Sequence, residues 1–148
     1  MAYEDHPDLS VLSSAIGYHL RRAQLAVFQD FTACFAELDL RPAEFSVLTV
    51  IARNPGLKQG EVAALLDIQR ANFVALMDRL ERRGLAERRR FPTDRRSYGL
   101  WLTRSGTEHT QRMFDLWHAH EERWVERLGG AGERDRLLDL LNRISSPA

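Results

Sequence analysis

The sequence predicts a mainly α-helical fold with a single small β-hairpin, and two observations support this prediction. Apolar residues recur at steps of three and four along most of the chain, which is the spacing of one face of a helix. Between residues 85 and 102 the spacing changes to two, on both sides of a turn-forming segment at residues 91–96. With 148 residues, 44% of them hydrophobic and 28% charged, the chain has the composition of a soluble globular protein with its own core.

The longest apolar stripe predicts one N-terminal helix of about eight turns. Its members are Leu9, Leu12, Ile16, Leu20, Ala23, Val27, Phe31, Cys34 and Leu38. This helix should end near Asp39, because Pro42 disfavours the helical conformation in the residue before it. A stripe of this length exceeds what the core of a compact monomer needs, so other helices or a second chain must pack along it.

Local signals mark the ends of the remaining elements. Pro42 suits the first turn of a second helix, Gly84 suits a C-terminal cap and Thr103 suits an N-terminal cap. The run Gly129-Gly130-Ala131-Gly132 should interrupt the last helical segment. Helices are therefore expected at residues 42–53, 59–66, 69–83, 104–128 and 133–144, and strands at residues 85–90 and 97–102.

Charge is distributed unevenly, although the chain as a whole is neutral, with 21 basic and 21 acidic residues. Residues 58–104 contain eleven basic and six acidic side chains, which gives this stretch a net charge of +5. The rest of the chain therefore carries −5. Such asymmetry is typical of a protein with one lobe that faces a polyanion and one that faces solvent.

Two helices joined by a short turn and followed by an arginine-rich hairpin predict a winged helix-turn-helix that reads DNA. The second helix of the pair fits the major groove, and the hairpin reaches the neighbouring minor groove. Arg suits guanine and Asn or Gln suits adenine, while Asp94 is placed to orient a neighbouring arginine. The residues expected to contact DNA are Lys58, Gln59, Gln69, Arg70, Asn72, Arg79, Arg90, Asp94, Arg95 and Arg96.

Three segments of the chain resemble the MarR family of bacterial regulators. They are Leu65-Leu66-Asp67-Ile68, the run from Leu80 to Arg88, and Asp94-Arg95-Arg96 followed by Leu100-Trp101-Leu102-Thr103. The resemblance implies a dimer built from residues 1–40 and 104–148, with a DNA-binding lobe at 41–103 and a pseudo-palindromic operator as partner. Lys58 departs from the family pattern, which often has Ser or Thr there to cap the next helix; Lys58 is therefore expected either to leave the helix start to another cap or to contact phosphate.

The implied dimer explains the long first stripe. Two chains that wrap their terminal helices around each other would bury Leu9, Leu12, Ile16, Trp124, Leu128, Leu137, Leu141 and Ile144. The two recognition helices would then lie about one turn of DNA apart.

The resemblance also implies a small aromatic effector bound between the dimerisation helices and the DNA-binding lobe. The candidates for its site are Tyr18, His19, Arg22, Phe45, His109, Met113 and Trp117. His19 and Arg22 are three residues apart, on one helix face, and together suit a carboxylate, thioester oxygen or phosphate. The segment from Ile68 to Asp78 is similar to the branch that controls degradation of hydroxycinnamates, whose members respond to aromatic acyl-CoA thioesters.

Other classes of function find less support in the sequence. His118 and Glu122 have a spacing that a metal accepts, but the zinc-protease, phosphate-loop and nucleophile-elbow motifs are missing, so neither catalysis nor a metal or cofactor is expected. Two alternatives stay open: a winged helix that binds only proteins, and a redox-sensing regulator that uses its single cysteine, Cys34. Polar residues 1–8 and the short apolar runs predict a cytoplasmic location without a membrane span.

Overall fold

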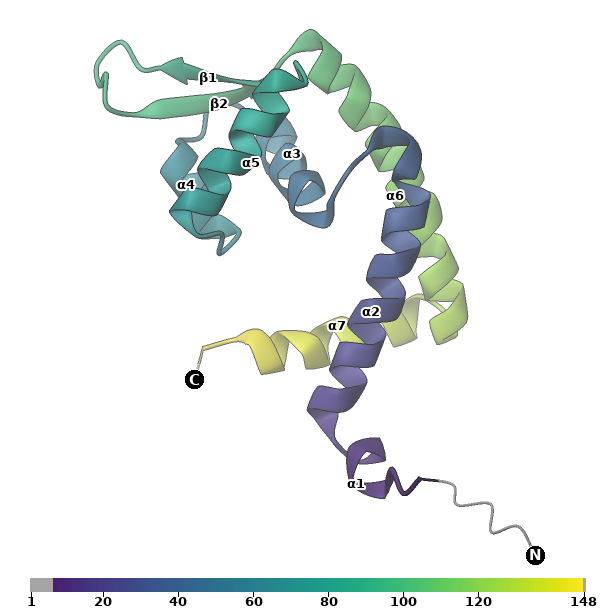
Figure 1. Ribbon diagram of the computed structural model, residues 1–148. Coiled ribbons are helices and arrows are strands. Elements are labelled where there is room, and N and C mark those ends of the chain that lie inside the picture. The colour runs from purple at the N-terminus through teal and green to yellow at the C-terminus, as the bar shows by residue number, and fades with distance from the viewer. Residues whose placement is uncertain (1–6, 148) are drawn as a thin grey trace, which may run out of the picture.

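Two long helices that lie side by side, α2 (Ile16–Cys34) and α6 (Arg104–Leu128), form an arm with a lobe at one end (Figure 1). The computed structural model describes residues 7–147. The lobe contains α3 (Pro42–Arg53), α4 (Gln59–Leu65), α5 (Arg70–Arg82) and the hairpin of β1 (Ala86–Arg90) and β2 (Tyr98–Leu102). At the other end of the arm lie α1 (Ser10–Ser13) and α7 (Ala131–Ser145).

The prediction of one continuous helix over the first apolar stripe is wrong. The helix is interrupted at Ser14 and Ala15, between α1 and α2, and its last turn is a separate 3₁₀ helix, η1 (Ala36–Leu38). The hydroxyl groups of Ser13 and Ser14 donate hydrogen bonds to backbone carbonyls three residues earlier, a local alternative to the helical pattern. Apolar spacing reports which residues share a face, and it does not report such breaks.

The other predicted elements are confirmed to within two residues at each end. Thr103 caps α6, because its Oγ1 accepts a hydrogen bond of 2.9 Å from the backbone N–H of Gly106. A Cβ at Gly106 would lie only 1.7 Å from the carbonyl oxygen of Leu85, so glycine is required for this close approach. The chain is thereby held tightly where the hairpin returns into the arm.

The hydrophobic core lies inside the lobe and extends to the junction with the arm. Its most deeply buried side chains are Phe35, Val47, Leu48, Ile51, Val62, Phe73, Met77, Leu80, Leu100 and Met113. The hairpin joins this core through Leu100, which pairs with Arg88 in the antiparallel register. The backbone N–H of Gly56 donates to the carbonyl oxygen of Leu100, and that of Leu100 donates to the carbonyl oxygen of Leu57, so the segment before α4 pairs with β2 through an isolated bridge between Lys58 and Gly99.

A buried carboxylate, that of Glu44 on α3, connects the lobe to the arm. Glu44 is only 2% exposed, and its Oε1 lies 2.6 Å from Nε of Arg79 on α5. Its other oxygen accepts a hydrogen bond of 3.0 Å from the backbone N–H of Arg41. Arg83, one turn further along α5, donates to the carbonyl oxygens of Leu38 and Asp39 at 2.6 and 2.9 Å. We call Glu44, Arg79 and Arg83 the Glu44 clamp; it ties α5 to the turn where the arm enters the lobe.

The far end of the arm exposes apolar side chains that a monomer would normally bury. The exposed members are Leu9, Val11, Leu12, Ile16, Leu128, Leu137, Leu138, Leu140 and Ile144. Helix α7 has no buried residue, although its apolar residues share one face. Of the residues expected in a dimer interface, Trp124 and Leu141 are half-buried and the others are exposed. Among the described residues, no helix is long and apolar enough to span a membrane.

Replacing Glu44 by Gln should lower the free energy of unfolding by about 3 kcal/mol, because two arginines lose their buried negative partner. Denaturant unfolding followed by circular dichroism measures this change. The control is Glu37→Gln, which removes an exposed carboxylate paired with Arg112 and should cost less than about 1 kcal/mol. Equal effects of the two substitutions would contradict the importance of the clamp.

Candidate nucleic-acid interface

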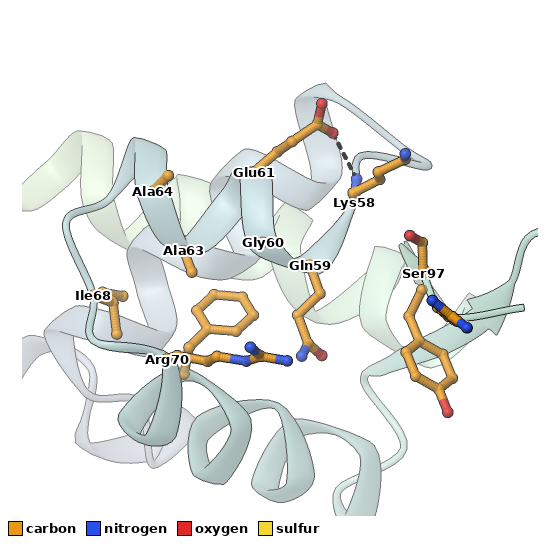
Figure 2. A pocket seen from close by; sticks show the side chains of 12 residues that line it. Lys58, Gln59, Gly60, Glu61, Ala63, Ala64, Ile68, Arg70 and Ser97 are labelled. Atoms are coloured by element: carbon orange, nitrogen blue, oxygen red, sulfur yellow. Dashed lines mark hydrogen bonds between the residues drawn. The ribbon is translucent and has the colours of Figure 1, made fainter. Parts of the chain in front are cut away.

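A hollow of about 710 Å³ opens between α4, the first turn of α5 and the hairpin (Figure 2). Its lining combines polar and basic residues with a small apolar floor: Lys58, Gln59, Gly60, Glu61, Ala63, Ala64, Ile68, Arg70, Phe73, Arg96, Ser97 and Tyr98. Four of the residues predicted to contact DNA, namely Lys58, Gln59, Arg70 and Arg96, therefore meet at one place, although they come from three elements.

The side of helix α5 that is predicted to contact DNA bases faces solvent. Gln69, Arg70 and Asn72 are exposed at the start of this helix. Phe73 and Met77 fix the rotation of the helix, because both are buried in the core. The helix begins one residue later than predicted, so Gln69 is the N-cap residue, with an extended backbone, rather than a residue of the first turn.

The hairpin tip is ordered by Asp94 in a way that the sequence did not indicate. The carboxylate of Asp94 accepts hydrogen bonds from the Ser97 hydroxyl at 2.7 Å and from the backbone N–H of Arg96 at 3.1 Å. These two bonds, that from Ser97 first, lower the pKa of Asp94. The carboxylate thus shapes the turn and does not hold an arginine side chain. Arg95 and Arg96 are both exposed at the tip.

Three of the predicted contact residues have partners within the protein. Arg79 belongs to the Glu44 clamp and lies away from the hollow. The guanidinium group of Arg90 lies 5.4 Å from the ring of Tyr98 and bonds its hydroxyl at 3.3 Å. The ammonium group of Lys58 lies 5.8 Å from the ring of Phe91. The contacts of Arg79 give it a structural role, and its contact with DNA stays a prediction.

The start of α4 is held differently from the family pattern with Ser or Thr. Glu61 reaches back and accepts a hydrogen bond of 2.9 Å from the backbone N–H of Lys58. The carboxylate of Glu61 therefore satisfies an N–H group at the helix start that has no partner within the helix. The lysine side chain remains exposed at the rim of the hollow.

Arg88 is one of the arginines of the hairpin strand β1, and its side chain binds within the protein. Its guanidinium group binds Asp78 at 2.8 Å, Glu81 at 3.1 Å and the carbonyl oxygen of Val74 at 3.1 Å, all on α5. It also binds the side-chain oxygen of Gln59 at 2.6 Å. The sequence signal for this role is the i, i+3 pair of acids on α5 opposite an inward position of β1.

The seven effector candidates form two separate groups in one subunit. Tyr18, His19 and Arg22 lie near the start of α2, where the guanidinium group of Arg22 is 5.6 Å from the Tyr18 ring. Phe45, His109, Met113 and Trp117 lie beside the core at the other end of the arm; the rings of Phe45 and Trp117 are 6.2 Å apart. The second group is marked on α2 by Phe31, whose ring packs against that of Phe45. Phe31 lies about 20 Å from Tyr18 along the helix, at a rise of about 1.5 Å per residue. One subunit does not bring them together.

Hollows beside α2 are lined by residues that the sequence did not single out. One, of about 430 Å³, is lined by Gln24, Leu25, Phe28, Gln29 and Thr32. Another, of about 390 Å³, lies against α6 and is lined by Ala26, Gln29, Asp30, Arg123, Trp124 and Arg127. The two hollows share Gln29. The missed sequence signal is that Leu25 and Phe28 are apolar although they lie outside the stripe of Ala23, Val27 and Phe31; both are exposed in the structure.

The histidines among the candidates differ in their surroundings. His19 is exposed, and its Nε2 lies 2.7 Å from the carbonyl oxygen of Ser13. Its N–H group therefore serves the break between α1 and α2, which leaves Nδ1 of the neutral ring as an acceptor. His109 is half-buried, and its Nε2 is shielded from solvent without a hydrogen-bond partner among the described residues. Burial, followed by the positive charge of Arg83, lowers the pKa of His109.

His118, Glu122 and Cys34 are the residues that the sequence offers for metal binding or redox sensing. Residues 7–147 contain no group of three or more His, Cys, Asp or Glu side chains with the geometry of a metal site. His118 and Glu122 are both exposed on α6. Cys34 is half-buried, with its sulfur 3.6 Å from the carbonyl oxygen of Leu116.

Two helices, α4 and α5, pack one side on the core, and the start of α5 is exposed beside a basic hairpin. These features define the class of winged helix-turn-helix DNA-binding proteins. A family model described as the MarR family matches residues 38–97. A "Putative transcriptional regulatory protein for hcr operon" of Thauera aromatica is 35% identical over 134 residues, which are 90% of this chain and 80% of the relative. The chain belongs to the MarR family of transcriptional regulators.

Solved structures of a repressor named CouR extend the likeness to the whole fold. CouR bound to a 23-mer DNA duplex is 46% identical, with a TM-score of 0.91, over 95% of this chain and 99% of that one. CouR bound to p-coumaroyl-CoA is 43% identical, with a TM-score of 0.87, over 97% and 100% of the two chains.

His109 should titrate below 6.5, the ordinary value of its side chain, because burial and Arg83 disfavour the charged ring. Since the unfolded chain then binds the proton more tightly, stability should fall as the pH drops through 6.5 towards the folded pKa. Histidine NMR titration measures the pKa, and His109→Gln assigns the signal and removes its part of the pH dependence. A midpoint at or above 6.5 would contradict the role of burial.

Proposed function

We propose that the chain is a repressor that binds a pseudo-palindromic operator as a dimer and leaves it when an aromatic acyl-CoA thioester binds. The observation that carries the DNA-binding part is the hollow at which the starts of α4 and α5 meet the basic hairpin. Asn72 is proposed to contact bases, as the sequence predicts, whereas the place of Arg70 in the hollow beside Gln59 favours a backbone phosphate for its guanidinium group. Arg95 and Arg96 are proposed to enter the minor groove. Lys58 and Gln59 are proposed to contact the DNA backbone.

The exposed apolar face supports the dimer. Residues 1–40 and 104–148 are proposed to form the dimerisation region, and residues 41–103 the DNA-binding lobe; residues 1–6 and 148 lie outside the described part of the chain. A second copy of the chain, related by a two-fold axis, would bury the exposed apolar side chains of α1, α7 and the end of α6. The chain is proposed to act by binding alone, without catalysis.

The effector proposal rests on an apolar hollow with a cation beside it. Leu25 and Phe28 line the hollow, and Arg22 lies three residues before Leu25, on the same side of α2. An aromatic acyl group suits the apolar part, and a carboxyl, thioester or phosphate oxygen suits the guanidinium group. The complex of CouR with p-coumaroyl-CoA favours this class of ligand.

Retardation of DNA from the protein's own upstream region in a gel at low salt tests the DNA-binding proposal. Wild-type protein should bind with an affinity that falls steeply as salt rises. Arg95→Ala should weaken binding by about 1–3 kcal/mol if the side chain is a groove contact. Absence of retardation at low salt would favour a winged helix that binds only proteins, and an unchanged affinity of the variant would exclude Arg95 from the interface.

Addition of p-coumaroyl-CoA to the DNA complex tests the effector proposal. The thioester should dissociate the protein from the DNA. Free p-coumaric acid should do so only at higher concentration, because it lacks the phosphate groups of coenzyme A. Arg22→Ala should raise the thioester concentration needed by about tenfold, the loss of one charge-assisted hydrogen bond. Arg104→Ala, a change at a fully exposed arginine of α6, serves as control. If the thioester dissociates the Arg22→Ala variant from DNA at the same concentration as the wild type, Arg22 is excluded from the effector site.

A further inference from the structure

The side-chain amide of Gln59 has a fixed orientation, because its oxygen is bound by Arg88. Nε of Arg88 donates to Oε1 of Gln59 at 2.6 Å, and the arginine side chain is only 16% exposed. The reverse orientation would place the amide NH₂ group against a guanidinium group, and both are donors only. Gln59 therefore has its NH₂ group available for another partner.

Arg88 is itself held from several sides. Nη1 binds Asp78 at 2.8 Å and Glu81 at 3.1 Å, and Nη2 binds the carbonyl oxygen of Val74 at 3.1 Å. Each nitrogen of this guanidinium group thus has an acceptor inside the protein. Arg88 is anchored on α5 and β1, so it orients a side chain of α4 relative to both.

The NH₂ group of Gln59 faces another donor across the hollow. Figure 2 shows the side chains of Gln59 and Arg70 extending towards each other from α4 and α5, and both line the same hollow. Glu61 also lines the hollow, but its carboxylate accepts the backbone N–H of Lys58. Two donor groups that converge without a shared acceptor favour an acceptor from outside the protein.

We infer that Arg88 is a positioning residue for DNA binding, which orients Gln59 so that its amide and the Arg70 guanidinium bind one backbone phosphate. This inference rests on the proposed DNA binding. A phosphate fits better than a base edge, because a charged phosphate oxygen accepts several hydrogen bonds at once and guanidinium groups bind it strongly. Arg88 is not proposed to contact the DNA, since four of its five N–H donors are bound within the protein.

The first test compares Gln59→Ala with Arg70→Ala on two duplexes, one from the protein's upstream region and one of unrelated sequence, by fluorescence anisotropy. Gln59→Ala should weaken binding to both duplexes about equally, by about tenfold. Its salt dependence should stay that of the wild type because the amide is neutral, whereas Arg70→Ala should lower the salt slope by about one phosphate contact. A loss on the upstream duplex alone would overturn the phosphate assignment.

The second test is a double-mutant cycle between Arg88 and Gln59. Arg88→Lys keeps the charge but loses Nε–H and the planar fork, so it should weaken binding about as much as Gln59→Ala and leave the salt slope unchanged. In the Gln59→Ala background, Arg88→Lys should have little further effect. Arg104→Lys, at an arginine outside the hollow, is the matched control and should bind like wild type.

The outcomes separate this inference from the proposed function. Independent, multiplying losses in the cycle would show that Arg88 acts through something other than Gln59 and would overturn the inference. A salt slope lowered by about one in Arg88→Lys would mean that Arg88 itself contacts phosphate, and would overturn it as well. If wild-type protein fails to bind either duplex at low salt, the proposed function fails. Thermal unfolding of each variant confirms that binding is measured on folded protein.

Discussion

The ion pair between Glu44 and Arg79 is the contact on which the geometry of the lobe depends. A carboxylate that is 2% exposed is unfavourable unless its oxygens are matched by positive or donor groups, and here Arg79 and the N–H group of Arg41 match them. Since Arg83 also binds the carbonyl oxygens that end η1, the reading helix α5 is fixed to the point where the arm enters the lobe.

On the surface proposed to face DNA, polar side chains are oriented by other polar side chains of the same chain. Asp94 orders the hairpin tip, Glu61 caps α4, and Arg88 orients Gln59. Such preorganisation lowers the entropy lost on binding, because the donors already have the required direction. The exposed cations Arg70, Arg95 and Arg96 then supply the charge that attracts a polyanion.

Much of the site followed from residue type and spacing, but the partners of individual side chains did not. Arg70 and Asn72 were placed correctly on the exposed face because Phe73 and Met77 define the buried one. The sequence predicts that Arg79 contacts DNA and that Arg88 belongs to an arginine-rich hairpin, yet both bind carboxylates of the same chain. Glu44 lies far from Arg79 along the chain, and no sequence motif marks Asp78 as a partner of Arg88. Only folding brings each acid within hydrogen-bond distance of its arginine. The break at Ser14 was missed for a similar reason, because apolar spacing continues across it.

By itself the sequence determined the class of fold, the order of its elements, the basic hairpin and the membership of its family, because these depend on local spacing, turn residues and motifs. Only the tertiary structure decided which arginines are bound inside the protein and which face solvent. It also separated the effector candidates into two groups along α2 and revealed the hollow at Leu25 and Phe28. These features depend on distances between segments far apart in the chain, and spacing along one helix or strand carries no information about such distances.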